Sequence, residues 1–235
     1  MIVIDAVSKS FGGLQAVAGL SAAIPDGEIF GLVGPNGAGK TTTIRMMTGI
    51  LRPDTGRILI NGHDIVNEPE EAKAGLGYIP DKPFFYEKLT AEEFIFFVAS
   101  IHKVQKSVAV SRTDELLELF GIDDRRDDLI EGYSQGMRQR LLFASALVHS
   151  PRALLIDEPF VGLDPFGVKM LKGVIKELGQ SGISIFLATH SLHIAEELCQ
   201  RVGFINKGRL DSIRSQEEIR SVEGGLEGLF LKLGS

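Results

Sequence analysis

The segment GPNGAGKT, residues 34–41, carries the residues best suited to chemistry in this sequence. It fits the pattern G-x-x-x-x-G-K-[ST], follows the apolar run EIFGLV and precedes TTTIRMMTGI, whose apolar residues have helical spacing. The glycines let backbone N–H groups turn toward an anion, and the helix directs its positive dipole end to the same place. The sequence therefore predicts a nucleotide phosphate site, with Lys40 on the β- and γ-phosphates and the Thr41 hydroxyl on Mg²⁺. The residues expected to contact the nucleotide here are Gly34, Pro35, Asn36, Gly37, Ala38, Gly39, Lys40, Thr41 and Thr42.

Two neighbouring carboxylates and one histidine follow apolar runs farther along the chain. Asp157 and Glu158 directly follow ALLI, residues 153–156, and His190 directly follows SIFLAT, residues 184–189. Ligands of open α/β sheets gather at the carboxyl ends of the strands. We therefore expect Asp157 to hold Mg²⁺, Glu158 to act as general base for the attacking water, and His190 to lie near the γ-phosphate, so that Lys40, Glu158 and His190 form the catalytic set. The histidines without comparable context, for which no role is expected, are His63, His102, His149 and His193.

The elements that must position these residues alternate between strands and helices. Several apolar runs are continuous enough to be buried on both faces, which is typical of a wound α/β sheet. Up to the turn Asn61-Gly62, strands follow one another with little helix between them, which indicates a small antiparallel sheet beside the main one. Between Thr90 and Ser150 helical patterns occur without a credible strand, which predicts an inserted helical lobe. The predicted strands are IVIDAV, EIFGLVG, RILI, LGYI, ALLID, SIFLAT and VGFI.

Capping signals punctuate the helices of this lobe. Thr90 with Glu93 forms a capping box ahead of FIFFVASI, and Ser111 with Asp114 is predicted to repeat the box ahead of LLELF. Gly121 stands where a C-terminal cap belongs. Near the end of the chain, apolar residues at helical spacing predict an amphipathic helix docked on the body. These residues are Leu226, Leu229, Phe230 and Leu233.

The segment YSQGMRQR, residues 133–140, resembles the signature region of ABC ATPases. LLFASALVHSP and ALLIDEP follow it in the order and spacing of that family, and the similarity runs from Phe11 to His190. In that family a short motif, usually LSGGQ, opens a helix and touches the γ-phosphate bound by the other subunit. Ser134 as N-cap and Gly136, which allows close backbone approach, suit such an anion contact. The resemblance implies a head-to-tail dimer in which each chain completes its partner's ATP site through Ser134, Gln135, Gly136 and Met137.

Further positions take their expected roles from the same resemblance. Phe11 stands where the family places an aromatic residue that stacks on adenine. GLDP, residues 162–165, resembles the D-loop and places Asp164 at the dimer seam. Gln135 and Met137 depart from the usual signature, where Gly and Gln stand. Asp81, in GYIPDKP, replaces the lid glutamine, and we expect it to act on Mg²⁺ directly or through a water molecule. The alternative is that Asp81 only caps the local turn, because Asp after Pro80 is common in turns.

Composition and charge restrict the partners and the location. A chain of 235 residues, 44% of them hydrophobic, can bury one large core. A formal charge of −6 with scattered Lys and Arg gives no reason to expect nucleic acid as a partner. The N-terminal run contains Asp5 and no basic head, which indicates a strand rather than a signal peptide, and no stretch is apolar enough to cross a membrane. The single Cys199 predicts no disulfide framework and a core or helix-face position.

Together these features predict an α/β fold of the P-loop NTPase class in a single ABC ATPase domain. Its RecA-like core with an antiparallel β lobe is expected at about residues 1–87 and 152–212, the helical lobe at about 88–151, and a helical tail at about 213–235. The resemblance implies ATP hydrolysis with Mg²⁺ that powers separate transmembrane permease subunits, together with a second ATPase subunit, at the cytoplasmic face of the cell membrane.

The direction of transport is left open between two readings. YIPD followed by a late LE-x-x-F-L motif is most similar to exporter ATPases of the ABC-2 type, whereas SKSFGGLQAV also resembles importer subunits. A non-transport ABC ATPase is the alternative from another class, although such relatives usually carry two cassettes or a long coiled-coil insertion. A small GTPase is disfavoured because no N-K-x-D motif follows the phosphate loop.

Overall fold

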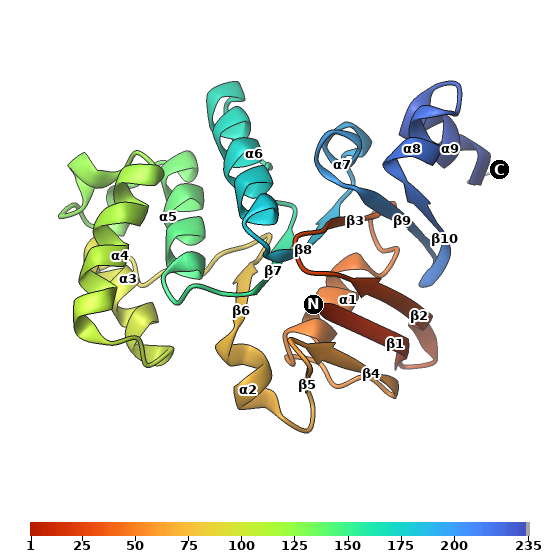
Figure 1. The fold of residues 1–235 in the computed structure, drawn as a ribbon, viewed down its shortest axis with the longest axis horizontal. Helices are drawn as coiled ribbons and strands as arrows, with labels where there is room; N and C mark the ends of the chain where they lie inside the picture. The colour runs from red at the N-terminus through yellow and green to blue at the C-terminus, as the bar shows by residue number, and fades with distance from the viewer. Residues whose placement is uncertain (234–235) are drawn as a thin grey trace.

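Residues 1–233 are described by the computed structural model, with side chains for residues 1–230. A six-stranded sheet forms its centre (Figure 1). In spatial order its strands are β10 (Arg209–Ser215), β9 (Arg201–Asn206), β3 (Ile29–Val33), β8 (Ser184–Thr189), β7 (Ala153–Asp157) and β6 (Leu76–Ile79). The strands from β9 to β6 pair in parallel, and β10 is antiparallel at one edge. Every residue of β3, β7 and β8 is buried, as their continuous apolar runs predict.

A smaller antiparallel sheet lies beside the main one. Its strands, in order, are β2 (Leu14–Ile24), β1 (Ile2–Phe11), β4 (Thr55–Ile60) and β5 (His63–Asp64). The predicted turn joins β4 to β5, with φ of 53° at Asn61 and 90° at Gly62. The predicted β lobe is confirmed, but β2 had no predicted strand of its own. Its sequence LQAVAGLSAAI contains four alanines and one glycine, which have low β propensity, so the pairing with β1 defines it.

Helices cover both faces of the main sheet (Figure 1). They are α1 (Lys40–Met47), α6 (Pro165–Gln180) and α7 (Leu192–Leu198). On one face, Ile44 of α1 lies in an apolar cluster shared by the two sheets. On the other face, Leu171 of α6 and Ile194 of α7 belong to a second cluster, and α2 (Pro69–Ala74) leads into the edge strand β6. Because β3, β8 and β7 pair in parallel, their carboxyl ends meet at one edge of the sheet, where the predicted site residues lie.

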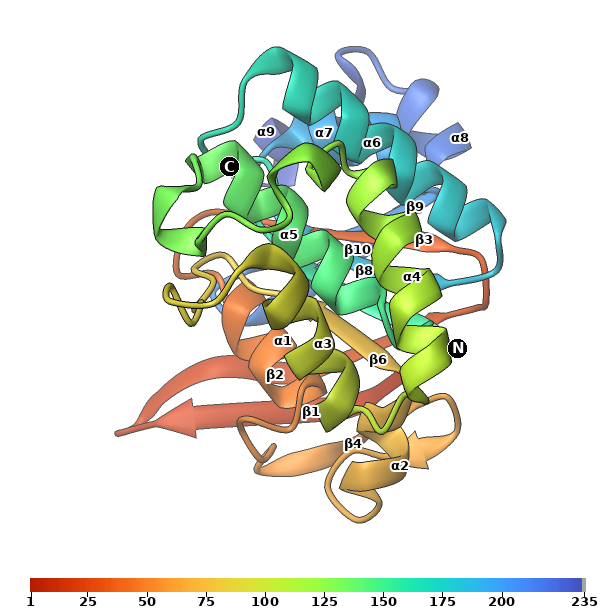
Figure 2. The same ribbon diagram turned by 90° about the vertical axis from the view of Figure 1, so that its left-hand side faces the viewer.

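The predicted helical lobe lies to one side of the sheets, at the left of Figure 1, and faces the viewer in Figure 2. It consists of α3 (Ala91–Ile101), α4 (Lys106–Leu119) and α5 (Gln135–Leu147). Thr90 and Glu93 form the predicted capping box, and Gly121 follows α4 with the left-handed φ of 60° expected of a C-terminal cap. The cap predicted at Ser111 is wrong. The helix begins well before it, and the Ser111 hydroxyl donates to Glu115 within α4.

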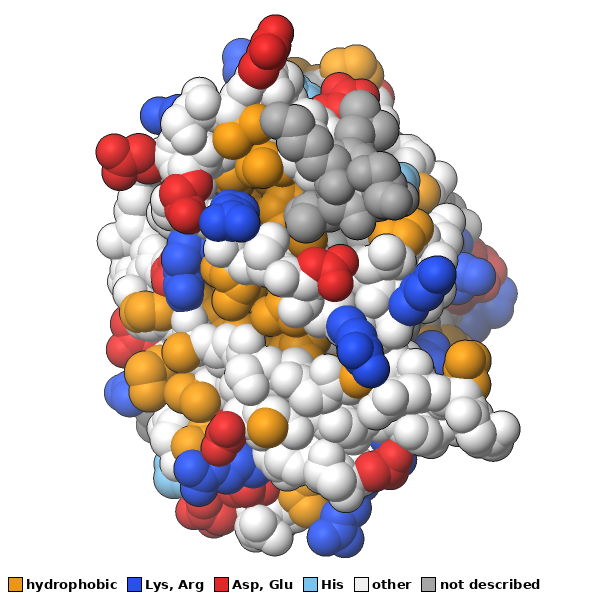
Figure 3. All heavy atoms as spheres, turned by 90° about the vertical axis from the view of Figure 1, so that its right-hand side faces the viewer, with side chains coloured by type: hydrophobic (Ala, Val, Ile, Leu, Met, Phe, Trp, Pro, Cys, Tyr) orange, Lys and Arg blue, Asp and Glu red, His pale blue; other side chains and the backbone are white. Residues whose placement is uncertain are grey.

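The chain ends in two short helices, α8 (Gln216–Arg220) and α9 (Gly225–Leu233), which lie next to β10 (Figure 1). The helical tail predicted from about residue 213 begins at Gln216, because residues 213–215 pair with β9. Leu226 is fully buried and Phe230 packs against the same cluster, whereas the side chain of Leu233 lies outside the described residues. The face that carries this end shows hydrophobic side chains between isolated charges of both signs (Figure 3).

The single cysteine, Cys199, follows α7 and is 1% exposed, as predicted for a core position. Burial raises the pKa of its thiol well above the ordinary value. Its sulfur lies against Gly31 of β3, where an added Cβ would come within 2.8 Å of Sγ. Among residues 1–233, no helix combines the length and the apolar character needed to span a lipid bilayer.

Candidate active site

One pocket of about 210 Å³ gathers most of the predicted phosphate and metal residues. It is lined by Ala16, Asn36, Gly37, Gly39, Lys40, Thr41, Thr42, Asp81 and Glu158. Four of the predicted nucleotide contacts are not among the lining residues: Phe11, Gly34, Pro35 and Ala38. Asp157 and His190 are not among them either. Ala38 is 3% exposed and packs in the apolar cluster beneath the loop, so it supports the loop from below.

The loop from β3 to α1 has a shape that requires glycine at its last residue. Gly39 has a φ of 113°, and an added Cβ would lie 2.5 Å from the backbone oxygen of Ala16 on β2. The small sheet therefore packs directly against the phosphate loop. Gly39 ends the loop, and α1 starts at Lys40 with its free N–H groups at the pocket.

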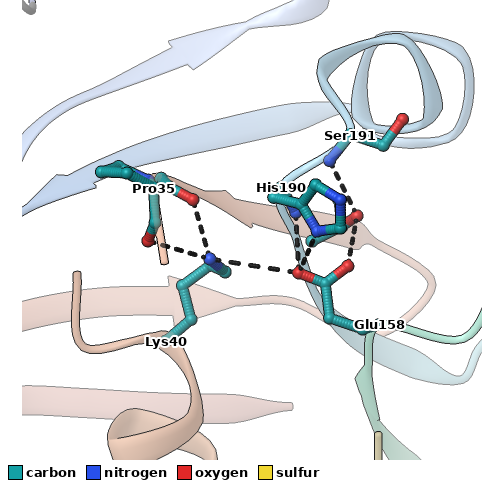
Figure 4. A network of polar contacts seen from close by, with 7 residues as sticks. Pro35, Lys40, Glu158, His190 and Ser191 are labelled. Carbon is teal, nitrogen blue, oxygen red and sulfur yellow. Dashed lines mark hydrogen bonds and ion pairs between the residues drawn. The ribbon is translucent and has the colours of Figure 1, made fainter. Parts of the chain in front are cut away.

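The Lys40 side chain lies in the pocket and forms hydrogen bonds with the backbone of its own loop (Figure 4). Its ammonium donates to the backbone oxygens of Gly34 at 2.7 Å and Pro35 at 3.2 Å. It also lies 4.0 Å from a carboxylate oxygen of Glu158. Burial lowers the pKa of Lys40, and the charges of Glu158 and Asp157 oppose that shift. A buried ammonium whose acceptors are backbone oxygens of its own loop is well placed to donate to phosphate oxygens as well.

Asp157, at the carboxyl end of β7, has the properties of a metal-binding carboxylate. It is 1% exposed, and its Oδ1 atom is buried without a hydrogen-bond partner among the residues that the structure describes. Burial raises the pKa of Asp157, and the nearby charges of Glu158 and Asp81 raise it further, while the Thr41 hydroxyl opposes the rise. A divalent cation would relieve both the unpaired oxygen and the mutual repulsion of these acids.

Glu158 is held by Thr189, the last residue of β8, and by His190, which follows it. Its carboxylate accepts bonds of 2.8 Å from the backbone N–H of His190 and 2.8 Å from the His190 ring nitrogen Nδ1 (Figure 4). The hydroxyl of Thr189 donates to the other carboxylate oxygen at 3.0 Å. Glu158 itself has a φ of 48°, a left-handed conformation that is costly for a residue with a side chain. Sequence reasoning placed His190 here but gave Thr189 no part in holding the base.

A second pocket of about 270 Å³ lies between the start of α5 and the start of α6. It is lined by Ser134, Gln135, Gly136, Arg140, Gly162, Leu163, Asp164, Gly167 and Leu171. Ser134 caps α5 by accepting a bond of 3.3 Å from the backbone N–H of Met137, and Asp164 caps α6 at 2.6 Å from Gly167. This pocket shares no residue with the first one. The predicted signature residues Ser134, Gln135 and Gly136 are therefore brought together with Asp164, at a place separate from the phosphate loop, whereas Met137 is not among the lining residues.

Comparison with known proteins identifies the family. The family model described as ABC transporter matches residues 17–161, more than half of the chain. The chain belongs to the ABC transporter family. The matched range contains the phosphate loop, the helical lobe with Ser134, and the acidic pair Asp157 and Glu158.

Relatives and solved structures agree with this assignment to the ABC family. The chain is 36% identical to the linearmycin resistance ATP-binding protein LnrL of Bacillus subtilis, over 96% of this chain and 72% of that protein. It is 39% identical to the bacitracin transport ATP-binding protein BcrA of Bacillus licheniformis, over 87% of this chain and 66% of that protein. A solved ATP binding subunit of an ABC transporter has a TM-score of 0.93 at 30% identity, covering 100% of both chains. The chain is thus an ABC ATPase with the P-loop NTPase fold.

The remaining predicted positions of this ABC ATPase lie outside the first pocket. Phe11 ends β1, is 46% exposed, and has the Lys9 ammonium 5.7 Å from its ring centre. The hairpin after Phe11 returns as β2, which brings Ala16 to the phosphate loop. No histidine is among the residues that line that pocket, and His190 reaches the site through its contacts with Glu158. His102 and His149 instead stack on each other with ring centres 3.6 Å apart.

Proposed function

We propose that this ABC ATPase powers an exporter, working at the cytoplasmic face of the cell membrane with separate transmembrane permease subunits and a second ATPase subunit. The observation that carries the hydrolytic part of the proposal is the arrangement around Glu158, whose carboxylate faces Lys40 and is fixed by Thr189 and His190. A carboxylate fixed beside a phosphate-binding lysine has the position required of a general base.

The phosphate loop, Lys40, Glu158 and His190 have separate tasks in hydrolysis. The loop N–H groups and Lys40 bind the phosphates of ATP. Glu158 accepts a proton from the attacking water, and His190 keeps the carboxylate in place through its ring and its backbone N–H. This arrangement requires that Nδ1 of His190 carries the hydrogen, because the carboxylate can only accept.

Mg²⁺ fits the residues next to the phosphate loop. The unpartnered Oδ1 atom of Asp157, the Thr41 hydroxyl and the nearby charge of Asp81 form a set of oxygen donors of the kind that Mg²⁺ prefers. When bound, the ion neutralises charge on the phosphate oxygens. Thr41 and Asp157 would hold it, and Asp81, which lines the same pocket, would act on it directly or through water.

A head-to-tail dimer is supported by the separation of the two pockets. The helix start capped by Ser134 offers unpaired N–H groups, yet it lies in a pocket that shares no residue with the phosphate loop. One ATP molecule in one chain uses the first pocket only. Two chains facing each other would place Ser134 and Gly136 of one chain over the phosphates bound by the other.

An aromatic groove gives the permease a surface on which to dock. It has a volume of about 480 Å³ and lies on the segment between Asp81 and the helical lobe, where Phe84 is 77% exposed and Tyr86 is 50% exposed. Exposed aromatic side chains of this size are unusual on a protein without a partner. Glu87 of the same segment pairs with Arg138 of α5 at 2.7 Å, which ties the groove to the signature helix.

Export is favoured over import by what the relatives are named for. The names of two of them refer to linearmycin resistance and to bacitracin transport. A transporter can confer resistance to an antibiotic by moving it out of the cell, so the proposal for this chain is export of a compound of that general kind.

Two measurements test this proposal. The purified chain is expected to hydrolyse ATP faster than GTP, with Lys40→Ala as the inactive control. An affinity-tagged chain recovered from native membranes is expected to carry a permease with it, and Phe84→Ser should reduce that recovery without changing the fold. Recovery with a soluble substrate-binding protein and an import permease would contradict export, and recovery without any membrane protein would contradict the transport role.

A further inference from the structure

The side chain of Gln135 turns back onto its own chain. Its amide nitrogen donates a hydrogen bond of 3.2 Å to the backbone oxygen of Val161. Gln135 is the first residue of α5, and Val161 lies in the loop 159–164 between β7 and α6. The bond therefore joins the helical lobe to the loop that leaves the main sheet directly after the acidic pair.

The backbone of the loop packs against the same amide group. Gly162 has a φ of 75°, and an added Cβ would lie 2.2 Å from the amide nitrogen of Gln135. Only glycine combines this conformation with such a close approach. Gln135 thus makes a hydrogen bond and a close backbone contact within one turn of the loop.

The two ends of this contact belong to different nucleotide sites in the proposed dimer. Ser134, next to Gln135, faces the ATP of the partner, whereas Glu158, three residues before Val161 in the sequence, serves the chain's own ATP. The connecting loop is short and braced at its far end by Asp164, which caps α6. The glycine of the usual signature has no side chain that could make this contact.

We propose that Gln135 is a positioning residue that couples the two nucleotide sites. A displacement of the start of α5 when Ser134 meets the partner's ATP is carried through the bond to Val161 and along the loop to Glu158. This inference rests on the head-to-tail dimer of the proposed function. Coupling of this kind makes the ATP dependence of turnover cooperative.

The contact itself is tested in the ATP-free protein by a double-mutant cycle. Gly162→Ala adds a methyl group that meets the Gln135 amide, so it should lower the melting temperature more in the parent than in Gln135→Ala. Gln139→Ala is the matched control. It changes the same residue type one turn along α5, and the effects of Gln139→Ala and Gly162→Ala should add. Additive effects for Gln135→Ala as well would overturn the contact.

The coupling is tested by the Hill coefficient for ATP turnover. We expect a coefficient above 1 for the parent and for Gln139→Ala, and a value near 1 for Gln135→Ala. Gln135→Asn, one methylene shorter, should behave like Gln135→Ala. A coefficient of 1 in the parent, or an unchanged coefficient in Gln135→Ala, would overturn the coupling role. Absence of ATP turnover in the parent would instead contradict the proposed function, while the stability cycle would still decide the contact.

Discussion

Glu158→Gln tests the base of the proposed mechanism with little disturbance of the structure. In the parent, one carboxylate oxygen accepts both bonds from His190 and the other accepts the hydroxyl of Thr189. A glutamine oxygen can accept the two bonds from His190, and its NH₂ group can donate to the Thr189 hydroxyl, which accepts as readily as it donates. The variant should therefore fold normally and keep its side chain in place.

The substitution should affect turnover and ATP binding in opposite directions. Loss of a general base reduces turnover by about 10²- to 10⁴-fold, which corresponds to about 3–5 kcal/mol in the activation free energy. The lost charge acts on binding: Glu158 lies 4.0 Å from the Lys40 ammonium, a gross attraction of about 4 kcal/mol at an effective dielectric constant of 20. Without that attraction Lys40 is freer to bind phosphate. Turnover should fall while ATP affinity holds or rises.

The assay compares steady-state ATP turnover, the ATP dissociation constant and the dimer fraction by size-exclusion chromatography with ATP. We expect a loss of at least ~10²-fold in turnover and an accumulated dimer. Thr189→Val is a matched probe, because it removes one hydrogen bond to the base, worth about 1 kcal/mol, and should cost about fivefold. Turnover of Glu158→Gln within about threefold of the parent would refute the assignment.

Three further predictions concern assembly, metal and pH. Lys40→Ala and Ser134→Arg chains should partly restore activity when mixed, and complete failure by two folded, associating variants would count against the head-to-tail dimer. Asp81→Ala should slow hydrolysis less than Glu158→Gln and raise the Mg²⁺ concentration needed for half-maximal rate, with Asp81→Asn similar if charge on the metal matters; an unchanged Mg²⁺ dependence would exclude the metal role. Burial, with His102 beside it, lowers the pKa of His149 to about 4 from an ordinary 6.5. The unfolded chain therefore binds this proton first, and His149 should cost about 2 kcal/mol of stability between pH 7 and pH 5. Urea unfolding should show that loss in the parent but not in His149→Gln.

The sequence alone was sufficient for features whose residue pattern fits only one local structure. The phosphate loop combines glycines, Lys40 and Thr41 between a strand and a helix, and Asp157 ends an apolar strand, so backbone geometry and strand polarity place them at one edge. The capping box of Thr90 and Glu93 was equally local, because both partners lie within one helical turn.

Other features depend on packing between distant segments. The strand β2 exists because β1 pairs with it, and β10 is a polar edge strand whose pairing with β9 is absent from any local pattern. Ser111 and Asp114 have the spacing of a cap but lie on the exposed side of a helix that had already begun. The contacts of Thr189 with Glu158 and of Gln135 with Val161 join residues on different elements, so only the tertiary structure reveals them.

The buried Cys199 makes the chain a convenient background for site-specific chemistry. A thiol that is 1% exposed and whose pKa is raised by burial forms little thiolate in the folded protein, and thiolate is the form that alkylating reagents attack. A cysteine introduced on the surface, for example on the exposed side of α5 or α6, would therefore be the main reactive thiol. Fluorophores or spin labels attached there would report the distance between two chains as ATP is added, without first removing a native cysteine.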